Sequence, residues 1–206
     1  MSANARIFIV DDDDAVRDSL ELLLRAAGFE AIVAYASARN FLAEAAPMPG
    51  ECLLLDVRMP DMDGLELQEE LNRRGIKLPV IIMTGHGDVP IAVRAMKAGA
   101  MDFIEKPFSD ELLVDCVRRA RRQAEEARRE GAEADEVRHR LQILTPRERD
   151  VLQGMIAGQP NKLIAHALGI SPRTVEIHRA RVMDKMAARS LSALVRMALA
   201  AGIESN

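Results

Sequence analysis

Polar side chains that could do chemistry stand at the ends of four short apolar runs in the first half of the chain. They are three aspartates, one threonine and one lysine: Asp11, Asp12, Asp56, Thr84 and Lys106. If the three carboxylates meet, they repel one another unless a cation lies among them, and oxygen ligands suit a hard ion such as Mg²⁺. A lysine and a hydroxyl are suited to holding a phosphoryl group. The pattern therefore favours Asp56 as a nucleophile toward phosphorus, forming an acyl phosphate.

Asp56 also has a plainer interpretation. It ends an apolar run, and Pro60 stops the backbone from continuing as it was. Aspartate at such a position often only caps the turn that follows. Taken alone, Asp56 fits both roles about equally well. Asp13 and Asp14 are interpreted as a solvated acidic turn in which one residue caps the next helix.

The apolar runs alternate with segments of helical spacing, which is typical of a parallel sheet covered by helices. The sequence predicts strands over residues 6–10, 29–34, 52–56, 78–84 and 101–105. It predicts helices over residues 16–28, 37–45, 64–75 and 91–98, and a last one that Ser109 caps. We therefore predict an α/β domain with a (βα)5 doubly wound parallel sheet and right-handed crossovers. Because the carboxyl ends of parallel strands share one edge, the five polar residues should converge there.

A charged segment follows this domain. Residues 118–130 are rich in helix formers, with opposite charges at helical spacing. The segment either extends the preceding helix or forms a loose charged linker, and the helical linker is our prediction. The interleaved glutamates argue against nucleic-acid binding by its arginines. We divide the chain into a domain over residues 1–122, a charged helical linker over 123–140 and a small all-α domain over 141–206.

The last segment carries an excess of positive charge. Residues 143–206 hold nine Lys or Arg and five Asp or Glu, although the whole chain has a net charge of −4. Thr145, Pro146 and Glu148 form a capping box at the start of a helix. A short helix over 161–168 is joined through Gly169 to a second that begins at 171–172, and another helix covers 190–201. Two helices joined by a short turn that contains glycine predict a helix-turn-helix.

The second helix of this pair has an apolar face and a charged face. Val175, Val182 and Met186 fall on the apolar side. A helix fits the major groove of DNA, where charged side chains read base edges or bind phosphates. The residues predicted to contact DNA are Lys162, Arg173, Thr174, Glu176, His178, Arg179, Arg181 and Lys185. The alternative on spacing alone is a small helical bundle with a charged, solvated face.

Several segments carry a resemblance to a known family. In the first domain they are VDDD (10–13), DVRMPDMDG (56–64), MTGHGDVP (83–90), AMKAGAMDF (95–103) and EKPF (105–108). In the last domain they are TPRER (145–149), NK (161–162), IA (164–165), SPRTV (171–175) and His178. The first domain resembles a response-regulator receiver domain. The whole chain resembles the FixJ branch of the NarL/FixJ transcription regulators, with a LuxR-type helix-turn-helix output domain.

The resemblance implies a role for each polar residue of the first domain. Asp56 would be the phosphoacceptor, Asp11 and Asp12 acidic Mg²⁺ ligands, and Thr84 and Lys106 would sense the phosphoryl group. With Asp56, Arg58 would complete the metal site through its backbone carbonyl. The peptide bond from Lys106 to Pro107 is expected to be cis. Phe103 matches the aromatic switch position of the family, and an ordinary core phenylalanine is an equal alternative. Arg181 departs from the asparagine that is common in the family, and its longer, charged side chain would add a phosphate contact or change the base preference.

The resemblance also implies partners. A sensor histidine kinase would donate the phosphoryl group, phosphorylation would pair two chains as a homodimer on promoter DNA, and RNA polymerase is a further partner to consider. A rival interpretation, a phosphohydrolase, needs a second carboxylate two residues beyond Asp56, where Arg58 stands. A second rival is a phosphorylated adaptor that acts through protein contacts alone. We therefore expect no turnover of an external substrate.

The N-terminal residues, the lengths of the apolar runs and the two cysteines bear on where in the cell the protein is found. Residues 1–6 are too short and polar for a signal peptide, and no run of 18 apolar residues could span a membrane. Cys52 and Cys116 match no metal or redox spacing, so both are expected to be buried thiols of a reducing compartment. These observations predict a cytoplasmic protein with no membrane partner.

Overall fold

The computed structural model describes residues 5–85 and 89–202. Residues 86–88, which belong to the MTGHGDVP segment, and the first four residues of the expected polar N-terminus lie outside the described residues. The chain divides into two compact units, residues 1–128 and 129–206, and each is described by itself. No helix in the described ranges is long and apolar enough to cross a membrane.

The first unit is built on a parallel sheet with the strand order β2-β1-β3-β4-β5. Its strands are β1 (Ile7–Val10), β2 (Ile32–Tyr35), β3 (Cys52–Asp56), β4 (Val80–Thr84) and β5 (Asp102–Glu105). Every residue of β1, β3 and β4 is buried, as expected for central strands covered on both faces. The predicted (βα)5 sheet is confirmed.

Two strands, β2 and β4, begin two or more residues later than predicted. Phe29 was expected to open the second strand, but its N–H donates to the Leu24 carbonyl and closes the end of the preceding helix. Gly28 adopts the left-handed conformation there, with φ of 90°, which a glycine tolerates without steric cost. β4 begins only at Val80, after Pro79, whose nitrogen carries no hydrogen to donate. Local hydrogen bonding at these positions overrides the apolar pattern.

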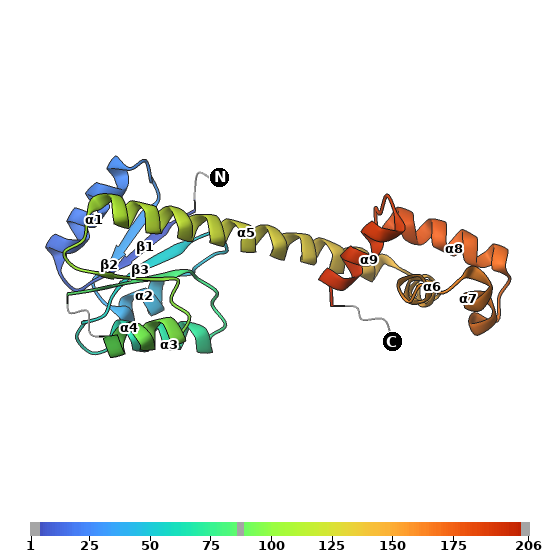
Figure 1. The fold of residues 1–206 in the computed structure, drawn as a ribbon, viewed down its shortest axis with the longest axis horizontal. Coiled ribbons are helices and arrows are strands. Elements are labelled where there is room, and N and C mark those ends of the chain that lie inside the picture. Colours follow the sequence, from blue (N-terminus) through green and yellow to red (C-terminus); the bar gives the residue numbers. More distant parts are fainter. Residues whose placement is uncertain (1–4, 86–88, 203–206) are drawn as a thin grey trace. The chain divides into compact units, whose positions relative to one another are not determined.

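Helices cover both faces of the sheet (Figure 1). They are α1 (Asp14–Ala26), α2 (Ala38–Glu44), α3 (Gly64–Arg73), α4 (Val89–Lys97) and α5 (Asp110–Ile143). Successive strand residues point to opposite faces. Ile7, Ile9 and Leu54 therefore pack with α1 and α5, while Phe8 and Leu55 pack with α2 and α3. This arrangement leaves the carboxyl edge of the sheet to the loops that carry the polar residues.

α5 is continuous from Asp110 to Ile143, which confirms the helical linker. Its N-terminus is capped by Ser109, whose hydroxyl accepts the Leu112 N–H at 3.3 Å. Opposite charges pair at helical spacing along its surface, as between Glu125 and Arg128 at 2.8 Å. The division between the two units falls at residue 128, inside the segment predicted as linker. The boundaries 1–122, 123–140 and 141–206 stay predictions.

The second unit is all-helical in its described residues. Its helices are α6 (Pro146–Ile156), α7 (Asn161–Leu168), α8 (Pro172–Lys185) and α9 (Leu191–Ala200), together with the last turns of α5. Thr145 and Glu148 form the predicted capping box at the start of α6. Gly169 ends α7 in the left-handed conformation, with φ of 65°, and turns the chain into α8. This is the predicted helix-turn-helix.

Candidate functional site

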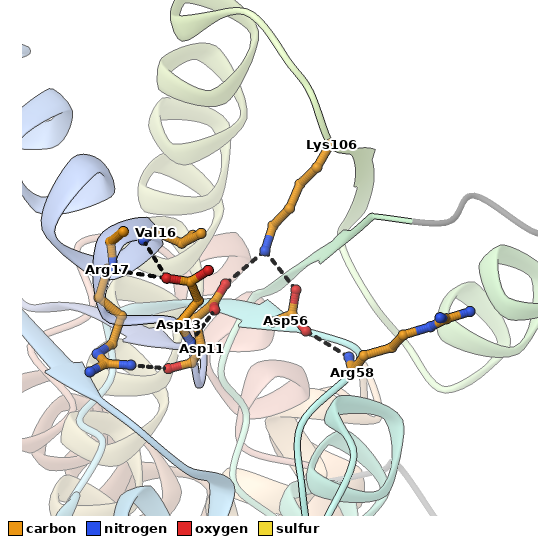
Figure 2. A network of polar contacts seen from close by, with 8 residues as sticks. Asp11, Asp13, Val16, Arg17, Asp56, Arg58 and Lys106 are labelled. Atoms are coloured by element: carbon orange, nitrogen blue, oxygen red, sulfur yellow. Dashed lines mark hydrogen bonds and ion pairs between the residues drawn. The ribbon is translucent and has the colours of Figure 1, made fainter.

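The carboxyl edge of the sheet brings three of the predicted residues into direct contact. Asp11 follows β1 and Asp56 ends β3, the strand that pairs with β1. Lys106 follows β5, and its Nζ lies 2.7 Å from Asp11 Oδ2 and 2.7 Å from Asp56 Oδ1 (Figure 2). One ammonium is therefore shared by two carboxylates that come from different loops. The sequence of any one of these segments, taken alone, does not predict the contact.

Asp56 is held at both of its carboxylate oxygens. Oδ1 faces Lys106, and Oδ2 accepts the backbone N–H of Arg58 at 2.6 Å. The residue is only 6% exposed. Burial raises the pKa of Asp56 above its usual value, although Lys106 and the Arg58 amide act in the opposite direction. Burial lowers the pKa of Lys106, but its bonds to Asp11 and Asp56 outweigh this and raise it, so the ammonium keeps its charge.

The loop after β3 folds back onto Asp56 because residue 64 has no side chain. The Gly64 N–H donates to the Val57 carbonyl at 2.9 Å. A Cβ at this position would lie 2.1 Å from the Asp56 carbonyl oxygen, well inside van der Waals contact. From the sequence, Gly64 was predicted only to open a helix. The sequence did hold a signal for this contact. Most residues are accepted at the first helical position after the cap Asp63, so a glycine there indicates that another part of the backbone lies too close for a side chain.

The loop after β1 separates the roles of its aspartates. Asp11 is buried, and its Oδ1 accepts the Asp13 N–H at 3.0 Å. Asp13 caps α1 by accepting the Ala15 N–H at 2.8 Å, as predicted for one residue of the acidic run. Arg17 donates to the Asp11 carbonyl at 2.6 Å, which fixes the loop from below the carboxylate. Asp12 is exposed instead, and it lines a surface groove of about 580 Å³ together with Arg58.

The acidic residues fit a magnesium ion rather than a metal cage. Among residues 5–85 and 89–202, no three His, Cys, Asp or Glu side chains are grouped so that they could hold a metal ion by themselves. Mg²⁺ is commonly bound by one or two carboxylates and keeps several waters, with phosphate oxygens completing its sphere. Asp11 and Asp56 lie on either side of one cation already, and Asp12 follows Asp11 directly. The residues present therefore suit Mg²⁺.

Thr84 and Phe103 occupy the adjoining strands. Thr84 is buried at the end of β4, and its carbonyl accepts the Lys106 N–H at 2.7 Å. The bond from Lys106 to Pro107 is cis, as the resemblance implied. Phe103 is half-buried and packs against the apolar cluster on the sheet face that carries α3. This position is compatible with both a core role and a switch role.

In the second unit, α8 presents its predicted polar face. Val175, Val182 and Met186 are fully buried. Of the eight residues predicted to contact DNA, four are exposed and four are half-buried: Lys162, Arg173, Glu176 and Arg181, then Thr174, His178, Arg179 and Lys185. His178 Nδ1 is buried, and within the described residues it has no hydrogen-bond partner. The helix therefore carries a largely basic outer surface over an apolar anchor.

Among the described residues, Lys185 differs from the rest of the predicted set in that its charge is already bound. Its Nζ donates to Glu148 Oε2 at 2.7 Å and lies 3.3 Å from the Ile143 carbonyl oxygen. Burial alone would raise the pKa of Glu148, but the bonds from Lys185 and Thr145 lower it to about 2. Position on the polar side of the helix suggested a DNA contact for Lys185. Its long side chain reaches back to α6 instead, so we leave it out of the DNA-facing surface.

Two family models match this chain. The response regulator receiver domain matches residues 7–118. The luxR family of bacterial regulatory proteins matches residues 142–198. Together they cover both units and leave most of the charged segment of α5 unmatched.

Curated relatives match nearly the full length. The chain is 49% identical to the transcriptional regulatory protein FixJ of Bradyrhizobium diazoefficiens, over 98% of each chain. It is 52% identical to FixJ of Rhizobium meliloti, over 95% of this chain and 96% of that protein. Among solved structures, the response regulator StyR matches with a TM-score of 0.84 and 42% identity, covering 95% of this chain and 98% of that one. Full-length FixJ from B. japonicum matches with a TM-score of 0.59 and 49% identity, over 97% and 98% of the two chains.

Proposed function

This chain belongs to the FixJ/NarL family of two-component response regulators, with a receiver domain and a luxR-type DNA-binding domain, and we propose that phosphorylation of Asp56 controls its binding to promoter DNA. It is a transcription regulator and not an enzyme with substrate turnover. The observation that carries the proposal is the buried Asp56 carboxylate, which shares the ammonium of Lys106 with Asp11.

Asp56 is proposed to accept the phosphoryl group from a phosphohistidine of a sensor histidine kinase. One carboxylate oxygen attacks phosphorus, so that a P–O bond forms while the P–N bond to the imidazole breaks. Lys106 and the Thr84 hydroxyl then hold the phosphoryl oxygens. Since the ammonium is within hydrogen-bond distance of Asp56 before the reaction, little rearrangement is needed to bring it to the product.

Receiver domains typically use Mg²⁺. In this chain the proposed ligands are the carboxylates of Asp11, Asp12 and Asp56 and the backbone carbonyl of Arg58. When bound, the ion supplies positive charge that offsets the charge of the phosphoryl oxygens. The Arg58 amide already fixes Asp56 Oδ2, which supports a metal site on this side of the carboxylate.

Phosphorylation is proposed to pair two chains through the surface of α4. Val89, Val93 and Met96 are 74%, 45% and 50% exposed on this helix. Thr84 ends the strand before α4, and Phe103 packs on the same side of the sheet, so a movement of Thr84 toward a phosphoryl group would be felt there. The apolar residues would then be covered by a second copy, which favours the dimer.

The paired chains are proposed to place two α8 helices in the major groove of double-stranded promoter DNA, in half-sites about one helical turn apart. The proposed contacts are Lys162, Arg173, Thr174, Glu176, His178, Arg179 and Arg181. Bound there, the protein would act on transcription together with RNA polymerase.

The experiment that tests the acceptor is phosphorylation of the full chain by a small-molecule phosphodonor with Mg²⁺, read as intact mass. The native chain should gain one phosphoryl group, and Asp56→Asn should gain none. Asp12→Asn should label more slowly, because it weakens the metal site without removing the nucleophile. Labelling of Asp56→Asn at the native rate would refute the assignment.

A further inference from the structure

Two helix ends of the same polarity meet in the second unit. α5 ends at Ile143, and α8 ends at Lys185, with Met186 as its C-cap. The last carbonyls of a helix have no partner within the helix and carry partial negative charge. Two such ends side by side should repel each other unless positive groups lie between them.

Each end receives a cation from the other helix. Arg140 of α5 donates through Nη1 to the Met186 carbonyl at 2.9 Å. Lys185 of α8 donates through Nζ to the Ile143 carbonyl at 3.3 Å. Glu136 accepts from Arg140 Nε at 2.9 Å and steadies the guanidinium. We call this pair of contacts, from Arg140 to Met186 and from Lys185 to Ile143, the crossed caps.

Apolar packing holds the same two ends together. Val137 and Leu144, near the end of α5, are buried in one cluster with Val182 and Met186 of the α8 segment. The last turns of α5 are therefore part of the core that supports α8. Arg140 is the polar member of this contact, and its side chain is 27% exposed.

We propose that Arg140 is a positioning residue for DNA binding, which fixes the direction of α8 by holding its C-terminal end against α5. This rests on the proposed function of α8 as the DNA-reading helix. At its other end α8 is fixed by the Gly169 turn and by Ser171, whose hydroxyl accepts the Thr174 N–H at 3.1 Å. Without Arg140 this end is held only by Lys185 and the apolar packing, and a small tilt of the helix would move the side chains that meet the groove out of register.

The crossed caps also connect α5, the helix that leaves the receiver, to α8, the proposed DNA-reading helix. α5 is the only segment through which the chain passes from the receiver into the second unit. The last turns of α5 are hydrogen-bonded to α8 through Arg140 and Lys185, and to α6 through Arg149, which donates to the Gln142 carbonyl at 3.3 Å. Arg140 thus links the linker helix to the helix that reads DNA.

The test uses full-length variants and a duplex selected from a random pool by the phosphorylated native chain. Arg140→Gln removes the cation, Arg140→Lys keeps it, and Arg138→Gln is the matched control. Arg138 lies on the same helix and, within the described part of the chain, forms its ion pair with Asp135, three residues away. Affinity is measured by fluorescence anisotropy over a range of salt concentrations.

Arg140→Gln should weaken binding about tenfold, as expected when one hydrogen bond from a charged group is lost. The slope of log K against log salt should stay native, because no phosphate contact is removed. Arg179→Ala should instead reduce that slope by about 0.9. Arg140→Lys should recover most of the affinity, and Arg138→Gln should bind as the native chain does.

Native affinity in Arg140→Gln would overturn the proposal. So would a reduced salt slope, which would mean that Arg140 contacts a phosphate directly. If Arg140→Gln unfolds below the assay temperature, Arg140→Lys is used as the test instead. Loss of DNA binding by Arg140→Lys, at a native melting temperature, would also overturn the proposal. Failure of the native chain to select any duplex would overturn the proposed function itself, a result that none of the variants could produce.

Discussion

Two lysine–carboxylate contacts of equal length lie in the two units of this protein, and their surroundings differ. Lys106 lies 2.7 Å from Asp56 in the receiver, and Lys185 lies 2.7 Å from Glu148 in the DNA-binding domain. In the receiver a second carboxylate, Asp11, shares the same ammonium at 2.7 Å. In the DNA-binding domain Glu148 has the lysine to itself and also accepts the Thr145 N–H at 2.9 Å.

The balance of charge decides what each contact does. Glu148 has all the donors it needs, so its pKa falls to about 2 and the pair only supports the fold. Asp56 has a raised pKa because burial outweighs its donors, and the receiver site therefore keeps an unmet demand for positive charge. Perturbed carboxyl groups of this kind are common at functional sites. The contact distance alone therefore does not separate the structural ion pair of Glu148 from the pair at the proposed phosphoacceptor Asp56.

The largest effect that we expect is a loss of stability in the receiver, caused by a substitution next to Asp56. Gly64→Ala places a Cβ 2.1 Å from the Asp56 carbonyl oxygen, which the rigid backbone cannot avoid. We expect a loss of about 3 kcal/mol in the free energy of unfolding, measured with urea. The control is Gly131→Ala, which meets no atom within 4 Å and lies inside a helix, so it should be neutral or slightly stabilising. Equal behaviour of the two variants would contradict the tight packing at Asp56.

Removing each lysine should separate the two sites. Lys185→Met leaves Glu148 buried without its main partner, and we expect a loss of about 2 kcal/mol in unfolding free energy. Lys106→Met should be destabilised similarly in metal-free buffer. Mg²⁺ should restore stability only to Lys106→Met, because the ion can replace the ammonium between Asp11 and Asp56. Thermal denaturation with and without Mg²⁺ measures this, and rescue of both variants would show that the ion acts nonspecifically.

Neutralising each carboxylate should change stability in opposite directions. Asp56→Asn removes a group whose ionised form is disfavoured by burial, so in metal-free buffer at neutral pH it should stabilise the chain by about 1 kcal/mol. Glu148→Gln should destabilise it, since the neutral amide loses the ion pair with Lys185. Urea denaturation of both variants decides, and a loss of stability in Asp56→Asn would remove the contrast between the sites.

The smallest effect is a pH dependence confined to the DNA-binding domain. The pKa of Glu148 is lowered from an ordinary 4.5 to about 2 in the folded chain. Its contribution to stability is therefore fully present above pH 4.5 and is lost as the pH falls toward 2. Melting temperatures of the native chain and Glu148→Gln should converge over this range. Parallel curves would mean that Glu148 does not titrate there.

Much of this architecture could be predicted because the signals are local. The buried strands carry uninterrupted apolar runs, and parallel strands bring their carboxyl ends to one edge, which is why Asp11, Asp56 and Lys106 could be grouped. The capping box of Thr145 and Glu148 and the turn at Gly169 are likewise visible over a few residues.

Most of what could not be predicted depends on which residues meet in the folded chain, whether they are near or far apart in the sequence. Lys185 was placed on the DNA-facing side because the helical period shows on which side of the helix a residue lies. The period does not show that the Lys185 side chain reaches Glu148, 37 residues earlier. The contact from Arg140 to Met186 in the crossed caps could not be predicted for the same reason, since the two residues are 46 positions apart. The glycine at position 64 indicates that another group approaches closely, but the sequence does not say that this group is the Asp56 carbonyl. Phe29 was misplaced because a helix-ending hydrogen bond cannot be distinguished from strand onset by apolar pattern alone.

The most direct measurement of the central claim is DNA affinity before and after phosphorylation, on the native chain and Asp56→Asn. A labelled duplex, selected by the phosphorylated native chain, is titrated with and without a small-molecule phosphodonor in the presence of Mg²⁺. The account predicts that the donor raises the affinity of the native chain by at least about tenfold and leaves Asp56→Asn unchanged. An equal rise in both chains, or none in a native chain shown by intact mass to be phosphorylated, would contradict it.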